Sequence, residues 1–106
     1  MKASLDTLLR RIPHDARFVK AFSHGSMSVE LYAPLGIDPQ MPHDQDELYF
    51  VQAGRADFYL NGETEPCQAG DCFFVPAGAE HRFLNFTHDF VTWVVFWGPK
   101  GGEKSL

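Results

Sequence analysis

The chain has 106 residues, with 44% hydrophobic content, 22% charged content and a formal net charge of −5. This length allows one globular domain, and the acidic balance argues against nucleic-acid binding, which needs clustered Lys and Arg. No segment approaches the roughly 20 consecutive apolar residues of a membrane span, and residues 1–11 lack the apolar core of a secretion signal, so we expect a cytoplasmic protein.

The first predicted element is a short helix. Its apolar residues recur at i, i+3, i+4 and i+7, and so share one face: Leu5, Leu8, Leu9 and Ile12. Ser4 precedes this pattern as an N-cap, and Pro13 ends it. The apolar face needs a covering surface, which either the rest of the domain or a neighbouring subunit can provide. We therefore treat residues 1–15 as an N-terminal helical arm.

From Ala16 onward the hydrophobic period changes to two. Runs of β-branched and aromatic residues, bounded by turn residues, predict strands at 17–22, 27–33, 47–53, 56–60, 63–68, 72–75, 82–86 and 90–97. Asn61-Gly62 between two of these runs is a strong hairpin signal, because both residues tolerate positive φ. Short strands at this spacing predict an antiparallel sandwich or barrel over residues 16–98. The Gly-rich residues 99–106 are expected to form a flexible C-terminal tail.

The two cysteines, Cys67 and Cys72, lie five residues apart across a predicted turn at Ala69-Gly70. This spacing does not fit a CxxC redox or zinc pair. We expect reduced thiols in a cytoplasmic protein, although the spacing leaves a disulfide bridge open.

One stretch of the sequence carries an extended motif. It reads Gly, five residues, Pro-x-Gly, two residues, His, three residues, Asn, and its fixed positions are Gly70, Pro76, Gly78, His81 and Asn85. Gly70 permits a tight turn into a strand, and the Pro-x-Gly segment permits a second turn at the end of that strand. His81 then opens the next strand, so its side chain shares a face with Phe83.

A second pattern precedes this motif: His43, three residues, Glu47, six residues and Gly54. Together the two patterns resemble the two motifs of the cupins, the first of which reads His-x-His, three or four residues, Glu, six residues, Gly. The first His of that pattern is missing, and Met41, or Gln40 with the longer spacing, stands in its place. The resemblance implies a small single-domain cupin, an all-β antiparallel jelly-roll barrel preceded by a short helix.

The same resemblance implies a metal site. Two imidazoles and one carboxylate, from His43, Glu47 and His81, suit a divalent transition metal ion and leave coordination positions open. Fe, Mn, Ni, Co and Zn are all candidates. Met41 and Gln40 are candidate fourth ligands, and because a thioether is a poor ligand for these metals, a His at position 41 is expected to tighten binding.

Each of these residues also has a simpler interpretation. His43 could be a loop histidine in an acidic stretch, Glu47 a solvent-facing strand residue, and His81 a structural histidine. The joint spacing favours a metal site, with a pocket that has lost its metal as the alternative. The remaining histidines stand beside Pro, Gly or Asp and are expected on the surface: His14, His24 and His88.

An apolar pocket is expected around these three residues. Strand alternation from Glu47 and His81, together with the other aromatic residues, predicts its lining: Tyr49, Val51, Phe58, Phe83 and Trp93, with Phe96 as a further contributor. Ligand sites in small barrels are mostly apolar, so the expected ligand or substrate is a small, partly apolar or aromatic molecule.

Two classes of function remain open. The first is a metal-dependent enzyme of dioxygenase, isomerase or lyase type, as the resemblance suggests. The second is a non-catalytic module that binds or senses a small ligand, with or without metal, since one fold supports both. No further acid–base pair or nucleophile is visible in the sequence. We also expect a homodimer, because a small barrel has a limited core and residues 18–22 could pair at a sheet edge.

Overall fold

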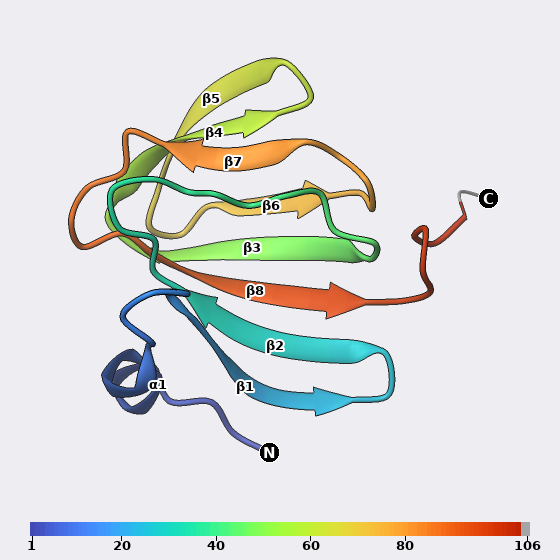
Figure 1. The fold of residues 1–106 in the computed structure, drawn as a ribbon, viewed down its shortest axis with the longest axis horizontal. Coiled ribbons are helices and arrows are strands. Elements are labelled where there is room, and N and C mark those ends of the chain that lie inside the picture. Colours follow the sequence, from blue (N-terminus) through green and yellow to red (C-terminus); the bar gives the residue numbers. More distant parts are fainter. Residues whose placement is uncertain (105–106) are drawn as a thin grey trace.

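Residues 1–104 are described by a computed structural model that contains one helix and eight strands (Figure 1). The helix and strands are α1 (Leu5–Arg11), β1 (Phe18–His24), β2 (Met27–Tyr32), β3 (Asp46–Ala53), β4 (Arg55–Leu60), β5 (Glu63–Gln68), β6 (Cys72–Val75), β7 (His81–Leu84) and β8 (Val91–Trp97). Every predicted strand is present, and no boundary differs from the predicted one by more than two residues.

The strands form two antiparallel sheets. Five strands pair in the order β1-β2-β8-β3-β6, and three pair in the order β5-β4-β7. The inner faces of the two sheets enclose an aromatic core in which Tyr49, Phe58, Phe83 and Phe90 are all at most 2% exposed. This arrangement confirms the predicted all-β antiparallel jelly-roll barrel with a short N-terminal helix.

Three residues with positive φ lie at turns that the sequence marks. Asn61 and Gly62 have φ of 47° and 93° and connect β4 to β5 as a two-residue hairpin, with Leu60 paired to Glu63. Gly54, which ends the first motif, has φ of 83°, and a Cβ there would lie 2.7 Å from Cα of Phe90. Only glycine fits this close approach of two backbones.

Helix α1 packs on the outer face of its own barrel, beside β1 and β2 (Figure 1). Leu8 is 3% exposed and packs with Leu31, Ala33 and Val91, whereas Leu9 is 40% exposed. The apolar face of the helix is therefore largely covered within the chain. Among residues 1–104, no helix is long and apolar enough to cross a membrane.

The segment after β8 makes several hydrogen bonds to the barrel. The backbone N–H of Gly98 donates to Oγ of Ser26 (3.0 Å), that of Gly101 to the carbonyl of Asp44 (2.7 Å), and that of Glu103 to Oδ2 of the buried Asp46 (2.9 Å). These bonds anchor residues 98–103, where the glycine content alone predicts a flexible tail. Residues 105 and 106 lie outside the described part of the chain.

The two cysteines are free thiols. Cys67 on β5 is buried, and Cys72 on β6 is exposed. Burial raises the pKa of Cys67 to about 11, and the nearby carboxylate of Asp71 contributes to this rise. Cys67 therefore belongs to the barrel interior and carries little thiolate near neutral pH.

Candidate metal centre

Three side chains meet inside the barrel and form what we term the His/Glu cluster: His43, Glu47 and His81. One nitrogen or oxygen atom from each lies within 4.8 Å of the corresponding atoms of the other two. Oε1 of Glu47 is 3.0 Å from Nε2 of His81 and 4.0 Å from Nε2 of His43. Glu47 comes from β3, His81 from β7 in the opposite sheet, and His43 from the loop before β3. The cluster therefore depends on the closed barrel.

Strand alternation and one turn position the three ligands. Glu47 and Tyr49 are both fully buried on the inner face of β3, and His81 at the start of β7 is 1% exposed. The loop that carries His43 is held by the Pro-x-Gly turn of the second motif, because the N–H of Gly78 donates to the carbonyl of His43 (2.7 Å). The two motifs thus contact each other directly at the site.

Glu47 is a buried carboxylate that, within residues 1–104, accepts no hydrogen bond of regular geometry. Its side chain is 1% exposed, and neither Oε1 nor Oε2 accepts a hydrogen bond from any residue between 1 and 104. The 3.0 Å contact with His81 does not have hydrogen-bond geometry. Burying a carboxylate that accepts no regular hydrogen bond is unfavourable, and coordination to a cation removes that cost. The two imidazoles and the carboxylate, whose oxygens accept no regular hydrogen bond within residues 1–104, together fit a divalent metal ion.

The ring of His81 is oriented for coordination. Its Nδ1 lies 2.9 Å from the carbonyl oxygen of Ala79, which can only accept, so Nδ1 carries a proton. Nε2 then faces Glu47 and can present a lone pair to a metal ion. Burial acts to lower the pKa of His81, but the Glu47 carboxylate and the Ala79 carbonyl raise it, and the net direction is upward.

The pKa of His43 moves in the opposite direction. Burial lowers it, the charge of Glu47 opposes this, and a protonated His81 lowers it further. The net effect favours a neutral His43, which is the form that binds metal. The ring also packs edge-on against Phe96, with the two ring centroids 4.9 Å apart.

The two candidate fourth ligands lie in different environments. Oε1 of Gln40 accepts a hydrogen bond from the hydroxyl of Tyr49 (2.9 Å) and lies 3.2 Å from Nε2 of His43. Met41 is 74% exposed and lies outside the cluster. The residue before a proline is biased toward extended backbone, so neighbours at 40 and 41 point to opposite sides of the loop. The structure thus differs from the expectation for Met41 and brings Gln40 to the cluster.

A buried aspartate that the sequence analysis does not identify orients Gln40. Asp38, 4% exposed, accepts hydrogen bonds from the hydroxyl of Tyr32 (2.5 Å) and from the backbone N–H of Phe83 (2.8 Å). It also accepts one from Nε2 of Gln40 (2.9 Å), which turns the amide oxygen of Gln40 toward the cluster. No sequence pattern indicates this role, because Asp38 lies in an aperiodic loop and its partner Phe83 is 45 residues away.

A cavity of about 250 Å³, which we term the His43 cavity, opens beside His43 and Gln40. Its walls include the apolar side chains of Phe18, Pro39, Val94 and Phe96, and the polar side chains of Glu30 and Tyr32. It is therefore a mostly apolar space that reaches the edge of the His/Glu cluster.

The residues predicted to line the pocket fall into two groups. Tyr49, Val51, Phe58 and Phe83 are buried in the core, where Tyr49 contacts His81 through its hydroxyl (3.1 Å). Trp93 lies on the outer face of the sheet with the α1 residues, and its Nε1 donates to Gln52 (3.0 Å). Trp93 is therefore a correction: Val94 and Phe96 are the β8 residues that face inward, and Trp93 has the opposite parity.

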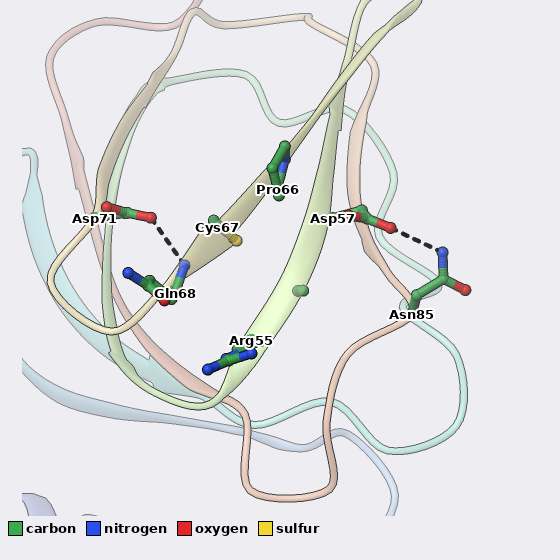
Figure 2. A pocket seen from close by; sticks show the side chains of 8 residues that line it. Arg55, Asp57, Pro66, Cys67, Gln68, Asp71 and Asn85 are labelled. Carbon is green, nitrogen blue, oxygen red and sulfur yellow. Dashed lines mark hydrogen bonds between the residues drawn. The ribbon is translucent and has the colours of Figure 1, made fainter.

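A second hollow, of about 500 Å³, lies elsewhere and shares no residue with the His/Glu cluster (Figure 2). Arg55, Asp57, Cys67 and Asn85 are among its lining residues. Asn85, the last fixed position of the second motif, has φ of 51° and donates from Nδ2 to Oδ2 of Asp57 (3.0 Å). In this structure Asn85 supports a turn and does not contact the cluster.

Comparison with known proteins agrees with this fold and site. The family model described as the cupin domain matches residues 28–97, and the chain therefore belongs to the cupin family. An uncharacterised protein of Streptomyces coelicolor is 40% identical over 104 residues, which cover 94% of this chain and 99% of that protein.

Two solved structures are similar in fold. The Cupin 2 conserved barrel domain protein of Salinispora arenicola superposes with a TM-score of 0.71 at 23% identity, over 92% of this chain and 88% of that one. The cupin-2 domain containing protein of Shewanella frigidimarina gives 0.70 at 16% identity, over 88% and 91%. These likenesses concern the barrel alone.

Proposed function

We propose that this cupin binds one divalent transition metal ion, from among Fe, Mn, Ni, Co and Zn, through His43, Glu47 and His81. We further propose that it acts as a metal-dependent enzyme on a small organic molecule. The observation that carries the proposal is the fully buried Glu47, whose carboxylate oxygens accept no hydrogen bond from residues 1–104 while two imidazoles lie beside them. A metal ion is the group that satisfies all three side chains together.

The surrounding residues support a binding role for the open side of the cluster. When bound, the ion would supply the chemistry of a dioxygenase, isomerase or lyase, with coordination positions left for ligands. Gln40 and Tyr49 border the cluster and are held in place through Asp38. The apolar His43 cavity offers space for the organic molecule on the same side.

Elemental analysis of the purified protein tests the metal site. We expect close to one transition metal ion per chain, retained after dialysis and lost in the triple variant H43A/E47A/H81A. A matched control, H14A/H24A/E65A, removes the same residue types from exposed positions and is expected to keep the metal. Circular dichroism establishes that both variants are folded.

The outcome separates the alternatives. A native protein that neither contains nor takes up any of these metals contradicts the proposal and leaves a metal-free ligand-binding module. A protein that binds metal, but turns over no substrate from a panel of small hydroxy, keto and phenolic compounds while binding some of them, is a metal-containing sensor. Turnover that disappears in the triple variant supports the enzyme.

A further inference from the structure

Glu30 is a second carboxylate on the inner face of the barrel. It lies on β2 and lines the His43 cavity together with His43 and Gln40. It does not belong to the His/Glu cluster, in which only His43, Glu47 and His81 bring their ligand atoms within 4.8 Å of one another. Its position on the cavity wall gives it access to a ligand bound there.

The charge of Glu30 is only weakly compensated within residues 1–104. No ion pair within 4.0 Å involves its carboxylate in this part of the chain, and the hydroxyl of Ser28, two residues before it on β2, acts to lower the pKa of Glu30 by hydrogen bonding. Lys20 stands directly opposite on β1, and its charge acts to lower the pKa of Glu30. Burial, the larger effect, raises that pKa, and the charge of Glu47 adds to the rise.

Most of the remaining lining is apolar, and Glu30 is its only carboxylate among residues 1–104; the other polar lining residues are Tyr32, Gln40 and His43. Phe18 and Phe96 provide flat surfaces, and Val94 and Pro39 complete the apolar lining. Such a cavity favours a ligand with an apolar body and one polar group placed to meet the carboxylate. His43, a member of the His/Glu cluster, also lines this cavity.

We propose that Glu30 binds the ammonium group of a small amine whose apolar body fills the His43 cavity. An ammonium group has three donors and a positive charge, and it satisfies a carboxylate more fully than a neutral hydroxyl does. A metal ion would neutralise Glu47 but leave the charge of Glu30 for the ligand. Binding of the amine by Glu30 does not depend on the proposed metal site. That the bound amine is also a substrate rests on the proposed function.

The test uses two probes of nearly equal shape, benzylamine and benzyl alcohol, titrated calorimetrically into the full-length protein near neutral pH. We expect benzylamine to bind about fivefold more tightly, because hydrogen bonds to charged groups are stronger than neutral ones. The isosteric variant E30Q is expected to remove this preference, and E65Q, which neutralises an exposed glutamate on β5, to retain it. K20Q is expected to increase the affinity for benzylamine, since it removes a competing cation.

Equal binding of the two probes by the native protein overturns the proposal, and so does an amine preference that survives in E30Q. Loss of metal from E30Q would also overturn it, because Glu30 would then be a metal ligand. The same titrations on chelator-treated protein separate the two hypotheses. An amine preference that depends on Glu30 in the absence of metal supports the Glu30 site whatever the outcome of the metal analysis.

Discussion

The hydroxyl of Tyr49 donates a 2.9 Å hydrogen bond to Oε1 of Gln40, and this bond joins the inner face of β3 to the loop that carries His43. Nε2 of the same amide donates to Asp38 (2.9 Å), which fixes which end of the amide faces the cluster. The amide oxygen of Gln40 is therefore oriented toward the cluster, 3.2 Å from Nε2 of His43.

The first prediction compares Gln40 with its neighbour Met41. We expect Q40A to weaken metal binding about tenfold, since residues that orient metal ligands typically contribute at this level. M41A is expected to have no effect, because Met41 is 74% exposed. M41H is expected to give no gain, contrary to the expectation from the motif alone. Competition with a chelator measures all three, and a tighter M41H site would show that the loop can turn its other side inward.

The sequence predicts the fold almost completely, for a physical reason. Strand identity is encoded locally by the two-residue period and by turn residues such as Asn61-Gly62, and the paired motifs place Glu47 and His81 on inward-facing positions. These signals do not depend on distant partners. The juxtaposition of His43, Glu47 and His81 follows from them once the barrel closes.

The parts that the sequence does not predict depend on tertiary contacts. Asp38 has its role only because its loop meets Phe83 from β7. In the sequence, Glu30 looks like an ordinary strand residue. Its place in the cavity follows only from the pairing of β2 with β8, which sets Glu30 opposite Val94. Trp93 is misassigned because periodicity shows which residues of a strand share a face but not which face is inside.

The second prediction concerns pH. Metal binding requires neutral imidazoles, and the raised pKa of His81 means that protons compete for Nε2 at higher pH than for an ordinary histidine. We expect metal affinity to fall as the pH is lowered from about 8 to about 6, across the range where histidines titrate. Chelator competition at several pH values checks this, and a flat profile across the range would contradict it.

The raised pKa of His81 affects the stability of the metal-free protein in the opposite direction: metal affinity increases with rising pH, whereas this contribution to the free energy of unfolding decreases. A folded-state pKa above the unfolded value of 6.5 stabilises the fold below that value, and this contribution is lost as the pH rises through the raised pKa. The free energy of unfolding contributed by His81 should thus decrease with rising pH. H81Q is expected to remove this part of the pH dependence.

The third prediction concerns the thiols. With a pKa near 11 and a buried side chain, Cys67 should resist iodoacetamide in the native protein at about pH 8, whereas the exposed Cys72 should react. Mass spectrometry is expected to find one label per native chain and two after denaturation. C72S should remain unlabelled until it is unfolded. Rapid native labelling of Cys67 would show that β5 opens readily.

The fourth prediction tests how the helical arm is attached. L8A removes a side chain that is 3% exposed against Leu31 and Val91, and we expect the free energy of unfolding to fall by about 2–3 kcal/mol. L9A, at a position 40% exposed, is expected to change it by less than about 0.5 kcal/mol. Urea denaturation compares the two. Equal effects would mean that Leu9 is also covered in solution.

The fifth prediction is the homodimer, and the structure changes the argument for it. The helical arm covers its own sheet, so its apolar face no longer calls for a partner. The five-stranded sheet, however, ends in two edge strands, β1 and β6 (Figure 1). Each carries a large exposed aromatic residue: Phe18 on β1 is 49% exposed and Phe74 on β6 is 51% exposed. Edge strands of this kind pair readily with a second copy.

We expect pairing through β1 and a mass near 24 kDa, twice the 12.0 kDa of the chain, by light scattering at micromolar concentration. F18D places a charge on that edge and should yield monomers, because each copy would bring a like charge to the interface. F74D makes the same change at matched exposure on the other edge and should leave the dimer intact. A mass of 12 kDa for the native protein refutes the dimer. Dissociation by F74D but not F18D would move the interface to β6.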